Sequence, residues 1–395
     1  MFYRNILKDI IPFIQTHDIL LFYGARQVGK SSLMKLIQEE YLQCRFLSFD
    51  LEEPWELLSL NQGPTVFVNN LISLYDRHTD EDLVIFIDEI QYLDNPTSFL
   101  KYLYDHYEHL KLIVSWSSTL EIRGKLKDSL AGRMLKFEIY PLSFEEFLRF
   151  KEKNELANAI GKKDIPQYIE VQIKEYFKEY LRFWWYPKMA LTNGEIYKKA
   201  YLKQIVDNYI SKDIKDIGKI RDIDGFNRLL HVLASQIWNL LNISELSNKI
   251  GVNLETIKNW IALLENTFVV KRIYPYSWNV RWELIKTPKI FFIDTGIRNY
   301  ILDDYEISGS VFENGFFSYI QNAYYTEHIN FFRTKEKQEI DFILNGIPYE
   351  LKLTYTGKWL LALSKFETIS WKKGKVITLE KSERSWKESF YPWEV

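Results

Sequence analysis

The sequence predicts a doubly wound α/β domain over residues 1–150, because short apolar runs alternate there with helix-patterned stretches. A glycine-containing loop follows the first apolar run and opens an amphipathic helix over Lys30–Tyr41; a second helix is expected over Pro96–Tyr107. The expected strands are Ile19–Tyr23, Arg45–Phe49, Leu83–Ile87, Leu112–Ser115 and Leu135–Ile139. Strands that alternate with helices indicate a parallel sheet covered on both faces.

Composition restricts the class of protein. The 395 residues are 47% hydrophobic and 26% charged, which is typical of about two to four globular domains. The net charge of −2 gives no overall attraction to nucleic acid or membrane, so a DNA contact requires a local basic patch. Cys44 is the only cysteine and the six histidines are scattered, which excludes a disulfide framework and zinc-finger spacing.

The sequence contains no apolar run of membrane-spanning length, and its first residues lack a signal-peptide layout. A cytoplasmic protein without a membrane partner is therefore expected.

The loop Gly24–Ser31 matches the pattern G-x-x-x-x-G-K-[ST]. Glycines at both ends allow backbone N–H groups to surround phosphate oxygens, and the helix N-terminus adds a positive dipole. In this motif Lys30 reaches the β- and γ-phosphates and the Ser31 hydroxyl binds Mg²⁺. The expected ligands are therefore ATP and Mg²⁺, and the expected nucleotide-binding residues are Gly24, Ala25, Arg26, Gln27, Val28, Gly29, Lys30, Ser31 and Ser32.

A pair of carboxylates ends the apolar run that begins at Leu83. Asp88 is expected at the carboxyl edge of the sheet beside the phosphate loop, where doubly wound folds bind ligands. It would hold Mg²⁺ through water, while Glu89 would orient or deprotonate the attacking water.

For each of two further residues, the sequence allows a functional and a structural interpretation. Ser115 ends a strand and either senses the γ-phosphate or simply forms a polar strand end. Arg133 is either an arginine finger acting across a subunit boundary or a structural surface residue.

The middle of the chain divides into a helical lid or linker over 151–240, interrupted at Pro187, and a helix-turn-helix over 241–284. Ser244 is the expected cap of the first helix, Gly251 supplies the turn, and Leu254–Glu265 forms the second helix. The strand that follows, Phe268–Ile273, completes the layout of a winged helix.

This region is also the candidate DNA contact, because basic, polar and aromatic side chains are interleaved there. Such residues either contact phosphates and bases or pack a core, and a winged helix serves equally as a protein-binding surface. The candidates are Asn253, Thr256, Lys258, Asn259, Lys271, Arg272, Tyr274, Tyr276, Trp278, Arg281 and Trp282.

Residues 285–395 are expected to form the C-terminal domain, and the chain is predicted to be mostly strand-like beyond Pro288. Asn345-Gly346 between two apolar runs predicts a β-hairpin, which places Glu350 and Lys352 on one face of the second strand. With Asp341 on the first strand and Glu313 upstream, these residues form a D…E-x-K pattern typical of metal-dependent nucleases. The same pattern also describes an ordinary cross-strand ion pair.

Several segments together resemble the prokaryotic AAA-type ATPases whose C-terminal half is a domain of unknown function, DUF4143. The resemblance covers nearly the whole chain and rests on the phosphate loop, Ile87–Gln91, Ser117-Ser118, Ala131–Arg133, Pro141–Phe147, Tyr209–Ile214, Phe291–Gly296 and Phe332–Thr334. It implies an ATPase core and a C-terminal domain similar to restriction endonucleases. Trp116 and Phe183–Pro187 depart from the family pattern.

The sequence thus predicts an ATP-binding and ATP-hydrolysing P-loop ATPase of the AAA type, expected to be a homo-oligomer. One hypothesis has it act on DNA through the winged-helix and nuclease-like domains. The alternative has its C-terminal domain bind a protein partner without catalysis.

Overall fold

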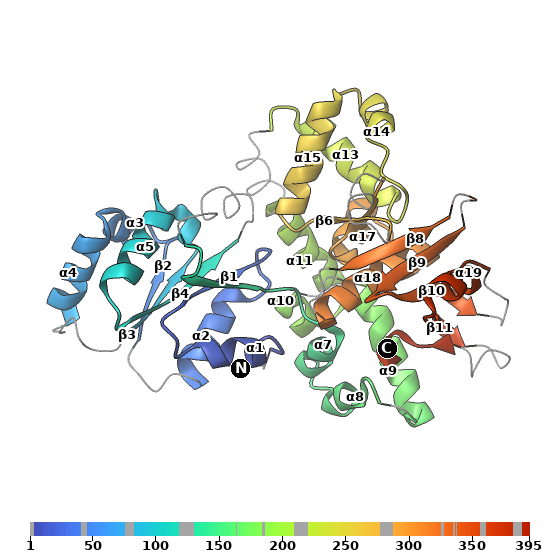
Figure 1. Ribbon diagram of the computed structural model, residues 1–395, viewed down its shortest axis with the longest axis horizontal. Coiled ribbons are helices and arrows are strands. Elements are labelled where there is room, and N and C mark those ends of the chain that lie inside the picture. Colours follow the sequence, from blue (N-terminus) through green and yellow to red (C-terminus); the bar gives the residue numbers. More distant parts are fainter. Residues whose placement is uncertain are drawn as a thin grey trace. The chain divides into compact units, whose positions relative to one another are not determined.

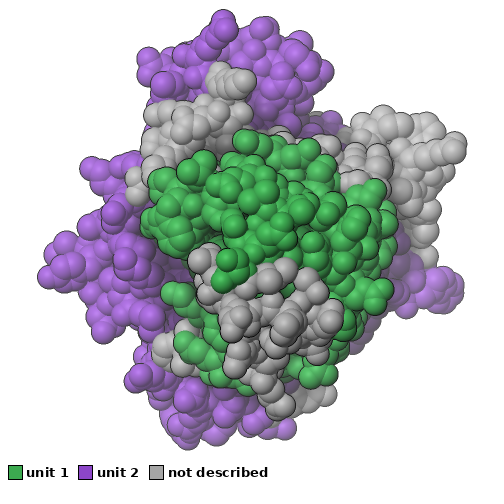
Figure 2. All heavy atoms as spheres, turned by 90° about the vertical axis from the view of Figure 1, so that its left-hand side faces the viewer, with its two compact units in different colours: residues 1–141 green, residues 142–395 purple. Residues whose placement is uncertain are grey.

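The computed structural model describes residues 4–40, 46–75, 83–117, 130–162, 164–183, 186–208, 220–276, 287–324, 328–334, 336, 338–355, 361–381 and 389–395. The chain forms two compact units, residues 1–141 and 142–395 (Figure 2). The first unit ends nine residues before the expected boundary at 150, and the second contains all three regions expected after it. No helix in the described ranges is long and apolar enough to cross a membrane.

Unit 1 is built on a five-stranded sheet with the order β2-β3-β4-β1-β5 (Figure 1). Every pair of neighbouring strands is parallel, which confirms the parallel α/β fold expected from the sequence. The strands are β1 (Ile19–Tyr23), β2 (Phe46–Asp50), β3 (Leu83–Asp88), β4 (Leu110–Trp116) and β5 (Met134–Glu138).

Alternation along the strands explains the two covered faces. Ile19 and Leu21 of β1 pack into an apolar cluster with residues of the helices that precede β3 and β4. Leu20 and Phe22 point the other way and are equally buried, which requires a second helical layer. The helices of this unit are α1 (Leu7–Ile10), η1 (Ile11–Phe13), α2 (Lys30–Glu40), α3 (Pro54–Asn61), α4 (Pro64–Tyr75), η2 (Ile90–Tyr92) and α5 (Pro96–His106).

Unit 2 begins with helices, as the sequence predicts, and Pro187 opens one of them. The N-cap of α14 (Ile243–Ile250) is Asn242 and not the expected Ser244. The side chain of Asn242 accepts a hydrogen bond from the N–H of Glu245. The helices are α7 (Phe144–Phe150), α8 (Asn154–Ala159), α9 (Gln167–Arg182), α10 (Pro187–Leu191), α11 (Glu195–Asn208), α13 (Ile223–Ser235), α14 (Ile243–Ile250) and α15 (Leu254–Asn266).

The rest of unit 2 contains two sheets. An antiparallel pair, β6 (Val270–Ile273) and β7 (Lys289–Phe292), follows α15. A mixed sheet has the order β12-β11-β10-β9-β8 (Figure 1). Its strands are β8 (Ile329–Arg333), β9 (Glu339–Leu344), β10 (Ile347–Tyr355), β11 (Lys375–Lys381) and β12 (Ser389–Phe390).

The prediction that the chain is mostly strand-like beyond Pro288 is wrong. The structure also places helices there: α17 (Thr295–Leu302), α18 (Gly309–Tyr324), α19 (Leu361–Ser370) and the short η4 (Pro392–Glu394). Helix α18 packs against β7 and β10 and is buried along most of its length, polar residues such as Asn314 and Ser318 included, so it lacks the one-sided pattern that identifies a surface helix.

The predicted hairpin at Asn345-Gly346 is confirmed. Strands β9 and β10 are antiparallel with Tyr349 opposite Phe342, and both turn residues have positive φ, 50° and 77°. Two successive positive φ values define the turn that best matches strand twist, which explains the Asn-Gly pair.

Candidate functional site

The loop between β1 and α2 has the backbone of a phosphate loop. A side chain at Gly24 would lie 2.2 Å from the carbonyl oxygen of Ile139, so only glycine fits there. Gly29 has a φ of 98°, and Gln27 is left-handed at 63°. These conformations curl the chain immediately before α2, so that the helix N-terminus, with its positive dipole end, opens at the loop.

Lys30 is held inside this loop. Its side chain is only 4% exposed, and its Nζ donates to the carbonyl oxygens of Gly24, 3.1 Å away, and Ala25, 3.0 Å away. The ammonium is therefore fixed within the loop and offers a positive charge to an anionic ligand. Among the other predicted loop residues, Arg26 contacts Glu52 and the hydroxyl of Tyr92, Val28 is buried, and Ser32 is exposed.

Asp88 ends β3 beside this loop. Its carboxylate accepts hydrogen bonds from the hydroxyls of Ser115 and Ser31, so the two predicted metal ligands lie together. Burial raises the pKa of Asp88, while these hydrogen bonds and the charge of Lys30 act in the opposite direction. A hydroxyl and a carboxylate are hard oxygen donors of the kind that Mg²⁺ prefers, so the residues present fit this cation.

Ser115 lies at the centre of a hydrogen-bond network. It is fully buried, donates to Asp88, and accepts from the backbone N–H of Glu89 at 2.9 Å. These contacts fix the end of β3, and they give Ser115 a structural role in the acidic pair whether or not it senses phosphate.

Glu89 is held by a residue to which the sequence assigned no role. The hydroxyl of Ser117 lies 2.6 and 2.5 Å from the two carboxylate oxygens of Glu89, and Gln91 donates to one of them. Glu89 itself has a left-handed φ of 55°, which is uncommon outside glycine. Such a conformation is characteristic of sites where the surrounding contacts dictate the backbone.

Arg133 lies immediately before β5, at the amino end of the sheet. Its guanidinium pairs with Asp105 at 2.7 Å and lies over the ring of Tyr104. The phosphate loop is at the carboxyl end of the adjacent parallel strand, β1, about 16 Å away for a strand of this length. Arg133 therefore lies away from the phosphate loop of the same chain.

The C-terminal carboxylates predicted from the hairpin do come together. Asp341 and Glu350 lie on adjacent strands and are 3% and 8% exposed. The N–H of Leu351 donates to Asp341 at 2.7 Å, and Lys352 pairs with Glu350 at 2.7 Å. Glu313 of α18 interacts electrostatically with Asp341, Glu350 and Lys352.

Burial and mutual repulsion dominate the electrostatics of this cluster. They raise the pKa of Glu313 to about 9, with burial as the larger cause and the charge of Asp341 as the next. One oxygen each of Glu313 and Glu350 is buried and accepts no hydrogen bond from the described residues. Nevertheless, within the described ranges no three His, Cys, Asp or Glu side chains are arranged to hold a metal ion.

The predicted DNA-contacting residues differ in their surroundings. Lys258 and Asn259 are exposed on α15, whereas Arg272 is paired with Glu265 at 2.5 Å and Tyr276 packs against Phe366. Trp278, Arg281 and Trp282 lie outside the described residues. Asn253 caps α15 through the N–H of Thr256.

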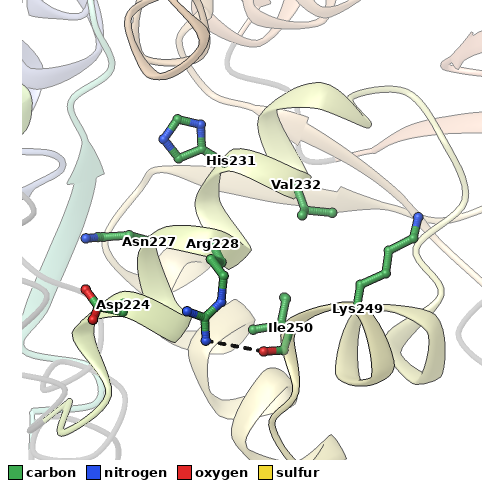
Figure 3. A pocket seen from close by; sticks show the side chains of 7 residues that line it. All are labelled: Asp224, Asn227, Arg228, His231, Val232, Lys249 and Ile250. Carbon is green, nitrogen blue, oxygen red and sulfur yellow. Dashed lines mark hydrogen bonds between the residues drawn. The ribbon is translucent and has the colours of Figure 1, made fainter.

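An open hollow of about 490 Å³ lies beside α13 and α14 (Figure 3). Arg228 and Lys249 give it two cationic side chains, whose charge Asp224 partly offsets, and His231 also lines it. The guanidinium of Arg228 turns towards the end of α14 and donates to the carbonyl oxygen of Ile250 at 3.3 Å. This hollow could not be predicted from the sequence, because its residues come from two helices and belong to no motif.

The parallel sheet, the glycine loop and the acidic pair together define a P-loop nucleotide-binding domain. In agreement, residues 16–148 match the family model described as "AAA domain", which supports an ATPase activity. Residues 174–306 match a second model, described as "Domain of unknown function (DUF8612)". The expected DUF4143 domain is not confirmed, since the model that matches in this half of the chain is a different one.

The relatives found by sequence are uncharacterised proteins. One from Methanocaldococcus jannaschii is 27% identical over 88% of this chain and 76% of its own length. Another, from Haemophilus influenzae, is 24% identical over 76% and 73%, respectively.

Solved structures give distant likenesses. A signal transduction ATPase with numerous domains from Pyrococcus horikoshii is 13% identical, with a TM-score of 0.30 over 81% of this chain and 45% of that one. A Drosophila ORC structure with AT-rich DNA and Cdc6 is 10% identical, with a TM-score of 0.27 over 77% of this chain and 92% of that one. Neither likeness is close enough to indicate a function.

Proposed function

We propose that unit 1 binds ATP with Mg²⁺ and hydrolyses it. The observation that supports this most strongly is the connected set of contacts from the phosphate loop to the acidic pair. Lys30 is fixed inside the loop, Ser31 bonds to Asp88, and Ser115 joins Asp88 to the backbone of Glu89. The groups to which we assign phosphate binding, metal binding and water activation thus lie in one connected network, and preorganisation of this kind favours catalysis.

Each residue has a distinct role in this proposal. The loop N–H groups and Lys30 bind the phosphates, and Ser31 and Asp88 hold Mg²⁺, which neutralises charge on the phosphate oxygens. Glu89 orients water or takes its proton. Ser117 positions Glu89, because its hydroxyl contacts both carboxylate oxygens.

Removing the metal tests the metal-binding part of this proposal. Phosphate release from ATP by the full chain should stop when a chelator is added and return with excess Mg²⁺. A cation held by Ser31 and, through water, by Asp88 keeps mostly water and phosphate ligands and so exchanges with the solution. Release that is unaffected by the chelator would contradict the assignment of Ser31 and Asp88.

We also propose that Arg133 acts on the nucleotide of a neighbouring subunit, because it lies at the opposite end of the sheet from its own phosphate loop. Arg133→Ala should then lose most of its phosphate release. Mixing it with an equally inactive Lys30→Ala protein should restore part of the activity, since a mixed interface combines an intact loop with an intact arginine.

A mixture that remains as inactive as its components would argue against action across a boundary. Asp105→Asn serves as the matched control. It disturbs the Arg133–Asp105 pair but leaves the guanidinium in place, so it should retain most of the turnover.

A second candidate function is metal-dependent cleavage of DNA by unit 2. It is favoured by the cluster of the buried Asp341 and Glu350 with the partly buried Glu313, and with Lys352 beside it. The two buried carboxylate oxygens without hydrogen-bond donors are also an observation that a bound cation would explain. The absence of a ready three-ligand arrangement in the described ranges weighs against it.

The variant Asp341→Asn tests this candidate. It keeps an oxygen that accepts from the N–H of Leu351 and removes only the negative charge. If the cluster is catalytic, the variant should lose Mg²⁺- or Mn²⁺-dependent cleavage of a DNA panel and keep the wild-type rate of ATP turnover. Cleavage by the wild type that survives in the variant would exclude this cluster as its source.

The alternative is an ATP-driven switch whose C-terminal domain binds a protein partner. It is favoured by the Glu350–Lys352 ion pair and the Asp341–Leu351 contact, which engage one oxygen each of Glu350 and Asp341 within the protein. DNA in single-stranded, duplex and branched forms distinguishes the two candidates. Stimulation of ATP turnover by one form supports action on DNA, with exposed Lys258 and the hollow lined by Arg228 and Lys249 as the candidate contacts. Indifference to every form supports the switch.

A further inference from the structure

Arg4 contacts the backbone of the phosphate loop through its guanidinium group. It precedes α1, is only 5% exposed, and its Nη1 donates to the carbonyl oxygen of Val28 at 2.9 Å. Val28 is the residue before Gly29 in the loop and is fully buried. The contact spans 24 residues of sequence, and no motif predicts it.

The planarity of the peptide bond gives this contact a consequence for the ligand. In a trans peptide the carbonyl of one residue and the N–H of the next point in opposite directions. The carbonyl of Val28 points towards the buried Arg4. The N–H of Gly29, which belongs to the same peptide unit, therefore points away from Arg4, to the opposite side of the loop. That N–H is among those that a phosphate loop presents to phosphate oxygens.

The same guanidinium has a second partner. Its Nη2 donates to the carbonyl oxygen of Tyr140 at 2.8 Å. The neighbouring Ile139 donates to Tyr23 at 2.7 Å and lies against Gly24, the first loop residue. The segment Ile139–Tyr140 is therefore tied to both ends of the phosphate loop, and it directly precedes Pro141, where unit 1 ends.

We infer that Arg4 is a positioning residue of the nucleotide site, which sets the Gly29 N–H for phosphate binding and links the phosphate loop to Tyr140 at the end of unit 1. This inference rests on the proposed nucleotide binding. The planar fork of arginine suits two carbonyls at once, whereas lysine brings a single point charge and cannot hold both in the same geometry.

The test is the affinity for ADP with Mg²⁺, measured by calorimetry on the full chain. ADP is used because it is not consumed and still carries the phosphates that the loop would bind. Arg4→Lys should bind ADP about ten- to a hundredfold more weakly than wild type, as expected for a misdirected hydrogen bond to a charged group. Arg4→Ala should be weaker still, and Arg4→Lys keeps the test valid if Arg4→Ala does not fold.

Lys111→Met is the matched control. Lys111 is another buried cation that ties the N-terminal segment to the sheet, donating to Phe13 at 2.8 Å and to Thr16 at 2.7 Å. It lies near the amino end of β4, away from the phosphate loop, so this variant should lower the melting temperature and keep the wild-type ADP affinity.

The results distinguish a failure of the proposed nucleotide binding from a failure of the role inferred for Arg4. No ADP binding by wild type would overturn the proposed function and this inference with it. Wild-type affinity in a folded Arg4→Lys protein would overturn the inference alone, as would equal weakening in Lys111→Met. Hydrogen exchange provides a second readout: on ADP binding, amides near Tyr140 should gain protection in wild type and less in Arg4→Lys.

Discussion

Glu89→Gln is expected to reduce ATP turnover about a hundred- to ten-thousandfold while leaving ATP bound, because a positioned acid or base contributes a factor of this size. The amide keeps an oxygen that accepts from the Ser117 hydroxyl, so the local structure should persist. Phosphate release under saturating ATP and an independent measurement of ATP affinity together check this prediction.

Glu52→Gln is the matched control. Glu52 is an exposed carboxylate that contacts Arg26 of the phosphate loop. It should retain nearly the wild-type rate. Near wild-type turnover in Glu89→Gln would mean that another group prepares the water, and the role given to Ser117 would be lost with it.

Lys30→Ala is expected to lower ATP turnover about a thousandfold or more and to weaken nucleotide binding. It removes a fixed positive charge from a buried site, where such groups contribute most to stabilising developing charge. The Gly24 and Ala25 carbonyls also lose the donor that they share. Calorimetry with ATP reports the binding loss, and single-turnover phosphate release reports the loss in rate.

Lys35→Ala provides the comparison on the same helix. Lys35 is exposed on α2, five residues beyond Lys30, and its removal should change neither quantity. If both lysine variants behaved alike, the loop would not be the phosphate site.

The parts of unit 1 that depend on local sequence could be predicted well. The phosphate loop, the strand that ends in Asp88 and the succession of strands follow from residue type and spacing, and the parallel sheet confirms that order. The Asn345-Gly346 turn could be predicted equally well, because only a few residue types adopt the left-handed conformation at two successive positions.

Contacts between distant segments could not be predicted. Arg4 reaches Val28 and Tyr140, and Ser117 reaches Glu89, without any shared motif. Helix α18 was missed for a different reason. Phe312, Phe316 and Phe317 are all buried, so burial on several sides removed the one-sided periodicity by which a helix is recognised.

The C-terminal cluster is an intermediate case. The sequence placed Asp341 and Glu350 on paired strands correctly, but it could not decide between a metal site and an ion pair, because both use the same residue types. The structure adds the buried Glu313 oxygen on one side and the Lys352 contact on the other. Cleavage assays are needed to decide between these readings.

The central claim is tested most directly by steady-state phosphate release from ATP with Mg²⁺, measured side by side for the wild-type chain and Lys30→Ala. We expect release by the wild type that is lost in Lys30→Ala, with both proteins folded to the same melting temperature within a few degrees. Equal release by the two proteins, or none by the folded wild type over a range of ATP concentrations, would contradict the assignment of an ATP-hydrolysing site to the loop Gly24–Ser31.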